Sequence, residues 1–174
     1  MPDAVSSDLE RERRLHRLLD AARSAMEEVP ICWVVTPAED GSGANARAVR
    51  DCTADVGGAA ADPWARWFLA LPGSRKAAEI RRAGRATLAY QHGSGDAYVT
   101  LSGPAELVDD RRVVAAGLRT VDDPDGSLAA RLVAVRVAVD HLELHVRGVT
   151  AGPWGHGRTL LGRDGRGAWR PLDG

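Results

Sequence analysis

The stretch Leu71-Pro72-Gly73-Ser74-Arg75-Lys76-Ala77-Ala78-Glu79-Ile80 joins a predicted strand, residues 64–71, to a predicted short helix through a Pro-Gly turn. Serine is among the residues preferred at a helix N-cap, so we expect the helix to begin directly after Ser74. One short helix inserted after the third strand of a chain rich in strands and turns is the feature that decides the fold prediction.

The first turn of this predicted helix carries two adjacent cations. Lys76 is the only lysine in the sequence, and it follows Arg75. Unpaired N–H groups make a helix start partly positive, so each cation there costs roughly 0.3–1 kcal/mol. A bound phosphate would remove this conflict, because backbone N–H groups, the Ser74 hydroxyl and both cations would then meet one dianion. The alternative is that both side chains point to solvent and pair with Glu79.

Composition is that of an ordinary globular protein and favours one domain. The 174 residues are 44% hydrophobic and 27% charged, and the formal net charge is −1. Such a balance gives no sign of a nucleic-acid-binding or membrane-surface protein. The sequence contains no apolar run of about 18 residues and no secretory signal pattern, so we expect a cytoplasmic location and no membrane partner. Cys32 and Cys52 fall within predicted strands and are expected to be buried thiols.

Hydrophobic periodicity predicts strands at 31–36, 45–53, 64–71, 86–91, 97–108, 132–139 and 142–148, and helices at 8–28 and 109–118 in addition to the one after Ser74. The short loop 92–96 predicts a hairpin between 86–91 and 97–108, and 132–139 with 142–148 is predicted to form a last hairpin. The pattern indicates a mainly β (α+β) fold: a closed or partly closed antiparallel barrel of six to seven strands with short flanking helices. The predicted organisation is an N-terminal amphipathic helix, 1–29, and a barrel domain, 30–174, in a single-domain protein.

A further cation, Arg47, lies in the middle of the predicted strand 45–53. Alternation places Ala46, Ala48 and Arg50 on one face and Arg47, Val49 and Asp51 on the other. If Arg47 points inward it needs an anionic partner, because an unpaired buried charge is very costly. The alternative is a surface arginine on the solvent face.

Several segments occur in an order that suggests a known family. They are Asn45-Ala46-Arg47-Ala48-Val49, Trp67-Phe68-Leu69 followed by Gly73-Ser74-Arg75-Lys76, Ala89-Tyr90-Gln91 with the segment 98–106, and Gly157-Arg158-Thr159-Leu160-Leu161 running to Trp169-Arg170. Together, over about residues 31–170, they resemble the pyridoxamine 5′-phosphate oxidase-like family of split barrels that bind flavin mononucleotide (FMN).

The resemblance implies a homodimeric flavoprotein with FMN at the subunit interface, acting as an oxidoreductase on a small molecule by hydride transfer at flavin N5. It further implies a site made of phosphate-binding residues (Arg47, Ser74, Arg75 and Lys76), backbone lining the flavin (around Val49, Arg50 and Leu69), Gln91 near the ring, and Trp154 and Arg158 supplied by the partner subunit.

The chain departs from the oxidases that act on vitamin B6. Its region 109–126 is short and acidic and carries no Tyr, Arg and Ser cluster for a substrate phosphate. The resemblance is therefore to the smaller general-stress-type branch. Two alternatives stay open: a reductase of the same fold that uses the deazaflavin coenzyme, and a non-catalytic flavin- or haem-binding stress protein.

Three side chains on one predicted strand face raise the question of a metal site. His141, Glu143 and His145 alternate with Leu142, Leu144 and Val146. Neighbours on one face of a strand lie roughly 6.5–7 Å apart, which is awkward for a single ion. A solvated strand face explains the same pattern, so no metal site is predicted. Trp33 and Trp67 are expected in the core because both lie within predicted strands.

Overall fold

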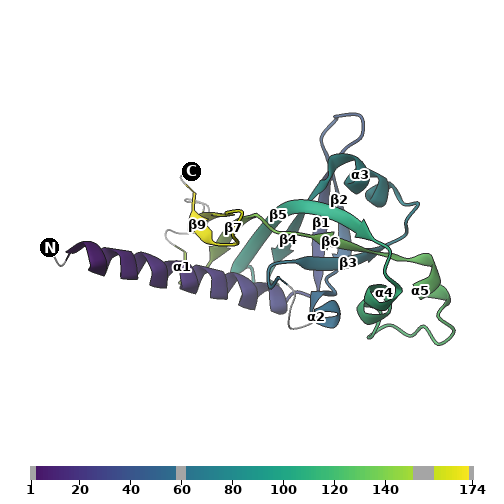
Figure 1. Ribbon diagram of the computed structural model, residues 1–174, viewed down its shortest axis with the longest axis horizontal. Coiled ribbons are helices and arrows are strands. Elements are labelled where there is room, and N and C mark those ends of the chain that lie inside the picture. Colours follow the sequence, from purple (N-terminus) through teal and green to yellow (C-terminus); the bar gives the residue numbers. More distant parts are fainter. Residues whose placement is uncertain (1–2, 58–61, 151–158, 173–174) are drawn as a thin grey trace. The chain divides into compact units, whose positions relative to one another are not determined.

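The computed structural model describes residues 3–57, 62–150 and 159–172 (Figure 1). They belong to two compact units. The larger unit contains residues 30–89 and 101–140, and the smaller contains 1–29, 90–100 and 141–174. None of the helices in the described ranges is long and apolar enough to cross a membrane. The predicted division into a helix, 1–29, and a barrel domain, 30–174, stays a prediction.

Five helices and nine strands occur in the described residues. The helices are α1 (Asp3–Glu27), α2 (Thr53–Val56), α3 (Arg75–Ala83), α4 (Arg111–Gly117) and α5 (Ser127–Arg131). The strands are β1 (Ile31–Pro37), β2 (Ala44–Arg50), β3 (Arg66–Ala70), β4 (Arg85–Gln91), β5 (Ala97–Val108), β6 (Val133–Val137), β7 (His141–Val146), β8 (Thr159–Arg163) and β9 (Trp169–Pro171). The mainly antiparallel α+β architecture agrees with the prediction, and β8 and β9 are additional strands in the tail.

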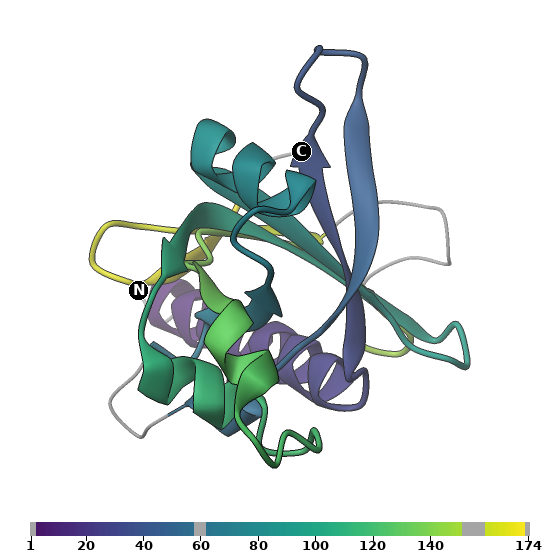
Figure 2. The same cartoon turned by 90° about the vertical axis from the view of Figure 1, so that its right-hand side faces the viewer.

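In the larger unit, β2, β1 and β4 are successive neighbours, and β6 pairs with β3 and β5. The β1–β2 hairpin sets Val34 opposite Arg47 and Thr36 opposite Asn45. Helix α3 lies beside this hairpin, and α4 and α5 pack against each other (Figure 2). The β1–β2 hairpin and α3 together position the candidate site.

Burial along β1 alternates strictly, and this corrects one prediction. Cys32, Val34 and Thr36 are at most 1% exposed, whereas Trp33 is 52% exposed. Because successive strand residues face opposite sides, burying the small residues turns Trp33 outward, so the prediction of a core Trp33 is wrong. Trp67 is half-buried against a cluster from α4 and β6.

Local hydrogen bonds explain two strands that are shorter than predicted. β2 ends at Arg50 because the Asp51 carboxylate accepts the N–H of Thr53 at 2.8 Å and starts α2. β3 begins only at Arg66 because the Asp62 carboxylate accepts the N–H of Trp64 at 3.0 Å in a turn. Neither the neighbouring residues nor the alternating sequence pattern shows by itself where a strand ends and such a turn begins.

The predicted hairpin between 132–139 and 142–148 is wrong, because the two strands use β5 as a shared neighbour. β6 pairs with β3 and β5, and β7 pairs with β5 and β8. In the segment that joins β6 to β7, the N–H of Ala138 donates to the Pro104 carbonyl at 2.8 Å, and that of Asp140 donates to the Ser102 carbonyl at 3.0 Å. The chain therefore continues along β5 instead of folding back.

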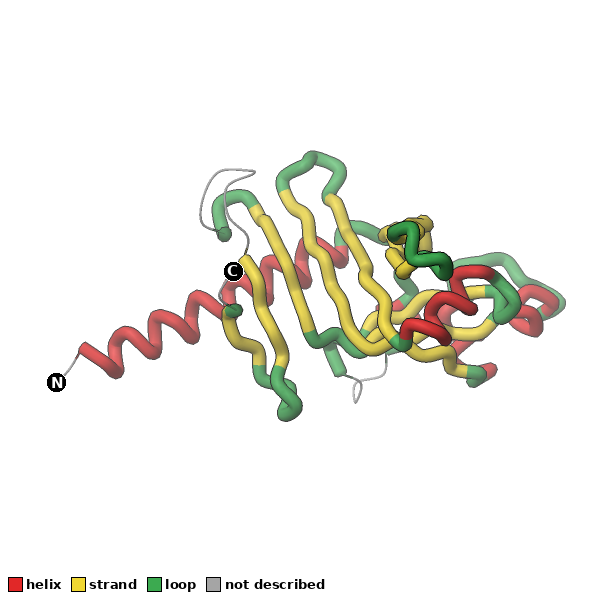
Figure 3. Tube along the Cα trace, turned by 90° about the horizontal axis from the view of Figure 1, so that it is seen from above, coloured by secondary structure: helices red, strands yellow, loops and turns green. Residues whose placement is uncertain are grey.

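The smaller unit places α1 against β7 and β9 (Figure 3). The buried stripe of α1 consists of Leu18, Leu19, Ala22 and Met26, at the predicted helical spacing. The helix begins at Asp3, five residues before the predicted start.

Candidate functional site

Helix α3 begins as the sequence predicts. The Ser74 hydroxyl accepts the N–H of Ala77 at 3.3 Å and donates to the Leu71 carbonyl at 2.8 Å. The helix ends at Gly84, whose φ of 63° is the left-handed conformation that favours glycine. Ala77, Glu79 and Ile80 form its buried side, so the cationic first turn is held at a fixed place against the strands.

Arg47 points inward from β2 and finds an anionic partner within the chain. Its Nη1 lies 2.9 Å from Oε2 of Glu79 and donates to the Thr36 hydroxyl at 3.2 Å. Its Nη2 is buried and has no hydrogen-bond partner in the described residues. The inward orientation that required an anion is therefore present, and one donor group of the guanidinium is left over for a further acceptor.

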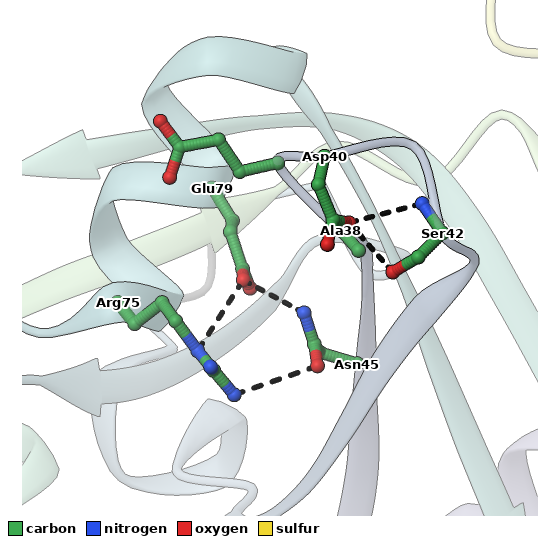
Figure 4. Close-up of a pocket in the computed structure, with 7 residues that line it drawn as sticks. Ala38, Asp40, Ser42, Asn45, Arg75 and Glu79 are labelled. Carbon is green, nitrogen blue, oxygen red and sulfur yellow. Dashed lines mark hydrogen bonds and ion pairs between the residues drawn. The ribbon is translucent and has the colours of Figure 1, made fainter.

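Glu79 is the centre of this cluster, and Figure 4 shows its contacts with Asn45 and Arg75. The side chain is 2% exposed and accepts from the Thr36 hydroxyl at 2.6 Å and from the Asn45 amide at 2.8 Å. The Thr36 hydrogen bond above all, and then Arg47, hold the pKa of this carboxyl below its ordinary value. Sequence reasoning gave Glu79 only a surface role, although its place beside Ile80 on the strand-facing side of the helix signals burial.

The two adjacent cations of α3 point to different surroundings. Arg75 is exposed, with Nε 3.6 Å from Glu79 Oε1 and Nη2 3.5 Å from the Asn45 side-chain oxygen. These residues line a cavity of about 440 Å³ together with Asp40 and Ser42. The pairing of Arg75 with Glu79 is the alternative that the sequence left open for this residue.

Lys76 instead lies near Arg47. Its ammonium stands over the Phe68 ring, 5.2 Å from the centroid. Partial burial, and next the charge of Arg47, lower the pKa of Lys76 below its ordinary value. Lys76 has no carboxylate partner in the part of the chain that the structure describes. The positive charges of Lys76 and Arg47 lie close together, and Nη2 of Arg47 has no hydrogen-bond partner among the described residues. An anion is therefore favourable at this place.

The residues predicted to line the flavin serve the scaffold through their side chains. Val49 is buried, and Leu69 packs against the cluster of Val114, Leu118 and Ala134. Arg50 donates from both terminal nitrogens to Asp55, at 2.7 and 2.8 Å, and also to the Gly117 carbonyl. The predicted flavin-lining role concerned the backbone of these residues. The side-chain contacts do not test it, so it stays a prediction.

The remaining predicted site residues are Gln91, Trp154 and Arg158. Gln91 is exposed at the end of β4 and belongs to the smaller unit. Trp154 and Arg158 lie outside the described residues. Their roles stay predictions.

The three residues of β7 considered as a possible metal site, His141, Glu143 and His145, differ in burial. His141 is exposed, Glu143 is half-buried and His145 is buried, with its ring stacked on Tyr98 at a centroid distance of 5.8 Å. Nδ1 of His145 lies 3.3 Å from the Thr150 hydroxyl. In the described ranges, no three His, Cys, Asp or Glu side chains gather closely enough to hold a metal ion.

Both cysteines are buried thiols and form no disulfide within the described residues, as predicted. Burial raises the pKa of the Cys52 thiol to about 12, so it stays protonated near neutral pH.

Comparison with known proteins identifies the fold. No family model matches the sequence, and no curated protein matches it. Among solved structures, a protein of the pyridoxinephosphate oxidase family related to general stress protein 26, from Clostridium acetobutylicum, has a TM-score of 0.60 at 14% identity, over 84% of this chain and 94% of that one. A pyridoxamine 5′-phosphate oxidase-related, FMN-binding protein from Nostoc punctiforme has a TM-score of 0.56 at 13% identity, over 100% and 98%.

A haem-binding protein from Mycobacterium smegmatis is also similar, with a TM-score of 0.56 at 15% identity, over 82% of this chain and 56% of that one. These likenesses confirm the predicted fold, the split barrel of the pyridoxamine 5′-phosphate oxidase-like type. At these sequence identities the likenesses support the fold alone, and the cofactor has to be inferred from the residues of the site.

Proposed function

We propose that this split barrel is an FMN-binding flavoprotein, and that it acts as an oxidoreductase on a small molecule. The observation that carries the proposal is Nη2 of Arg47, which is buried and has no hydrogen-bond partner among the described residues, with the Lys76 ammonium close enough to feel its charge. Solved structures of the same fold include a protein described as FMN-binding.

The charge of the cluster suits a phosphate monoester. Arg47, Arg75 and Lys76 carry three positive charges and Glu79 one negative charge, a net charge of +2 for these four side chains. Glu39 and Asp40 line the cavity on the Arg75 side and add two negative charges there, so the phosphate is assigned to the Arg47 and Lys76 side. A phosphate monoester carries about −1.5 to −2 near pH 7. Arg47 and Lys76 would bind this phosphate directly, assisted by the unpaired N–H groups of the first turn of α3 behind the Ser74 cap.

Bound FMN would supply hydride transfer at flavin N5, and the chain would supply binding, orientation and exclusion of water. In this proposal, Arg75 adds charge at the rim of the site. Backbone around Val49, Arg50 and Leu69 would line the flavin, and Gln91 would lie near the ring.

We further propose a homodimer in which Trp154 and Arg158 of the partner subunit cover the flavin. This part rests on the sequence resemblance. Size-exclusion chromatography with light scattering on the holo and apo forms tests it, and a flavin-loaded monomer would contradict it. A cytoplasmic location stays a prediction.

An absorbance spectrum of freshly purified protein, before and after addition of FMN, tests the proposal. A yellow protein with the bands of oxidised FMN supports it. A colourless protein that binds only added deazaflavin coenzyme would replace FMN with that coenzyme. A Soret band would favour the haem-binding alternative, in keeping with the likeness to the mycobacterial protein.

A further inference from the structure

The two oxygens of Glu79 accept hydrogen bonds from three side chains, and one of the oxygens forms a longer ion pair with a fourth. Oε2 receives the Thr36 hydroxyl at 2.6 Å and Nη1 of Arg47 at 2.9 Å. Oε1 receives the Asn45 amide at 2.8 Å and lies 3.6 Å from Nε of Arg75. These donors come from β1, β2 and the first turn of α3, so one buried carboxylate joins all three elements.

The neighbours of Glu79 restrict where the Arg47 guanidinium can lie. Thr36 is fully buried, and its hydroxyl both donates to Glu79 and accepts from Nη1 of Arg47. The guanidinium is planar, so fixing Nη1 also fixes the direction of Nη2. Within this guanidinium, Nη2 is the atom that is buried and has no hydrogen-bond partner among the described residues.

Holding the Arg47 side chain in place before the ligand arrives strengthens binding, because less side-chain entropy is lost on binding. A free arginine side chain carries about 2 kcal/mol of rotamer entropy, which is lost when a ligand immobilises it. A guanidinium already held at one end loses less, and its charge does not swing into solvent.

We infer that Glu79 is a positioning residue: it holds Arg47 through Nη1 so that Nη2 is aimed at the phosphate of the ligand. This inference rests on the proposed FMN site. Glu79 itself does not touch the phosphate, since both are anions, and its effect on binding passes through Arg47.

The experiment measures FMN and riboflavin affinity of the apo protein by flavin fluorescence, for wild type, Glu79→Gln, Arg47→Met and the double variant. Riboflavin lacks the phosphate, so it reports on the rest of the site. Glu106→Gln is the matched control, because Glu106 pairs with Arg136 at 3.2 Å on the surface. Circular dichroism melting confirms that each variant is folded.

We expect Glu79→Gln to weaken FMN binding by about tenfold or more, the size of one charge-assisted hydrogen bond. Riboflavin affinity should not change, and in the Arg47→Met background the Glu79→Gln substitution should have little further effect. Glu106→Gln should bind both flavins as wild type does.

Three results would overturn the inference while the proposed function stands: FMN binding by Glu79→Gln at wild-type strength or tighter, an equal loss for FMN and riboflavin, or an unchanged loss in the Arg47→Met background. If Glu79→Gln does not fold, Glu79→Asp keeps the charge but withdraws it by one methylene. That variant should also bind FMN more weakly, and full affinity would count against positioning. A wild-type protein that binds no FMN would refute the proposed function and the inference together.

Discussion

The guanidinium of Arg47 is bound at one end and open at the other: Nη1 lies 2.9 Å from Glu79 Oε2, whereas Nη2 is buried and unpartnered among the described residues. A single carboxylate stabilises the inward arginine without using all its donors. The remaining donor, with Lys76 nearby, is the physical basis of the proposed phosphate site.

The pKa of Lys76 should report ligand binding. Burial, and next the charge of Arg47, lower it in the free protein, and a bound phosphate would raise it toward or above its ordinary value of 10.5. Because the sequence has one lysine, NMR of protein labelled with ¹³C-lysine gives a single titrating signal. A pKa that is ordinary in the apo form and unmoved by FMN would contradict this account of the site.

The ionised Glu79 should stabilise the fold in a defined pH range. Its folded-state pKa lies below the ordinary value of 4.5, so its contribution is complete above pH 4.5 and is lost as the pH falls through the folded value. The difference in urea midpoint between wild type and Glu79→Gln should therefore shrink from pH 7 to pH 3. Asp40, Asp125 and Asp164 titrate in both proteins and cancel in the comparison. A constant difference would show that the charge of Glu79 is not what stabilises.

Ser74 should contribute to stability and binding separately. Ser74→Ala removes the cap on the Ala77 N–H and should cost about 1 kcal/mol in the free energy of unfolding. Ser74→Asp restores a cap but places a negative charge at the helix start, so it should regain stability and still weaken FMN binding. Chemical denaturation and flavin titration of the two variants separate these effects. Tight FMN binding by Ser74→Asp would place the phosphate elsewhere.

Gly103 is required by the crossing of β5 with the segment after β6. A Cβ at this position would lie 1.9 Å from the Ala138 carbonyl oxygen, which is backbone and cannot turn away. Gly103→Ala should therefore destabilise the protein by about 3 kcal/mol or more. Gly165→Ala, where a Cβ meets nothing within 4 Å, is the control and should be near neutral. Equal melting temperatures for the two variants would contradict the shared use of β5 by β6 and β7.

Local signals predicted the elements that hold the site. The Ser74 cap and the Pro-Gly turn located α3, and alternation along β2 grouped Arg47 with Val49 but left open whether that face points inward. Contacts between residues far apart in the sequence could not be predicted from such local signals. The partner of Arg47 is Glu79, 32 positions away, and the local signal for burial of Glu79, its place beside Ile80, does not identify Arg47 as the partner. The strand-pairing of β6 likewise depends on competition for β5, and the outward Trp33 depends on which face of β1 the barrel covers.

The most direct test of the central claim is the preference for FMN over riboflavin, measured by isothermal titration of the apo protein with each. We predict that wild type prefers FMN by about a hundredfold or more, that Arg47→Met with Lys76→Met abolishes this preference, and that Arg75→Ala, whose guanidinium pairs with Glu79 and Asn45, reduces it less. Equal affinity of the wild type for the two flavins, or an undiminished preference in the double variant, would contradict the claim that Arg47 and Lys76 bind a phosphate.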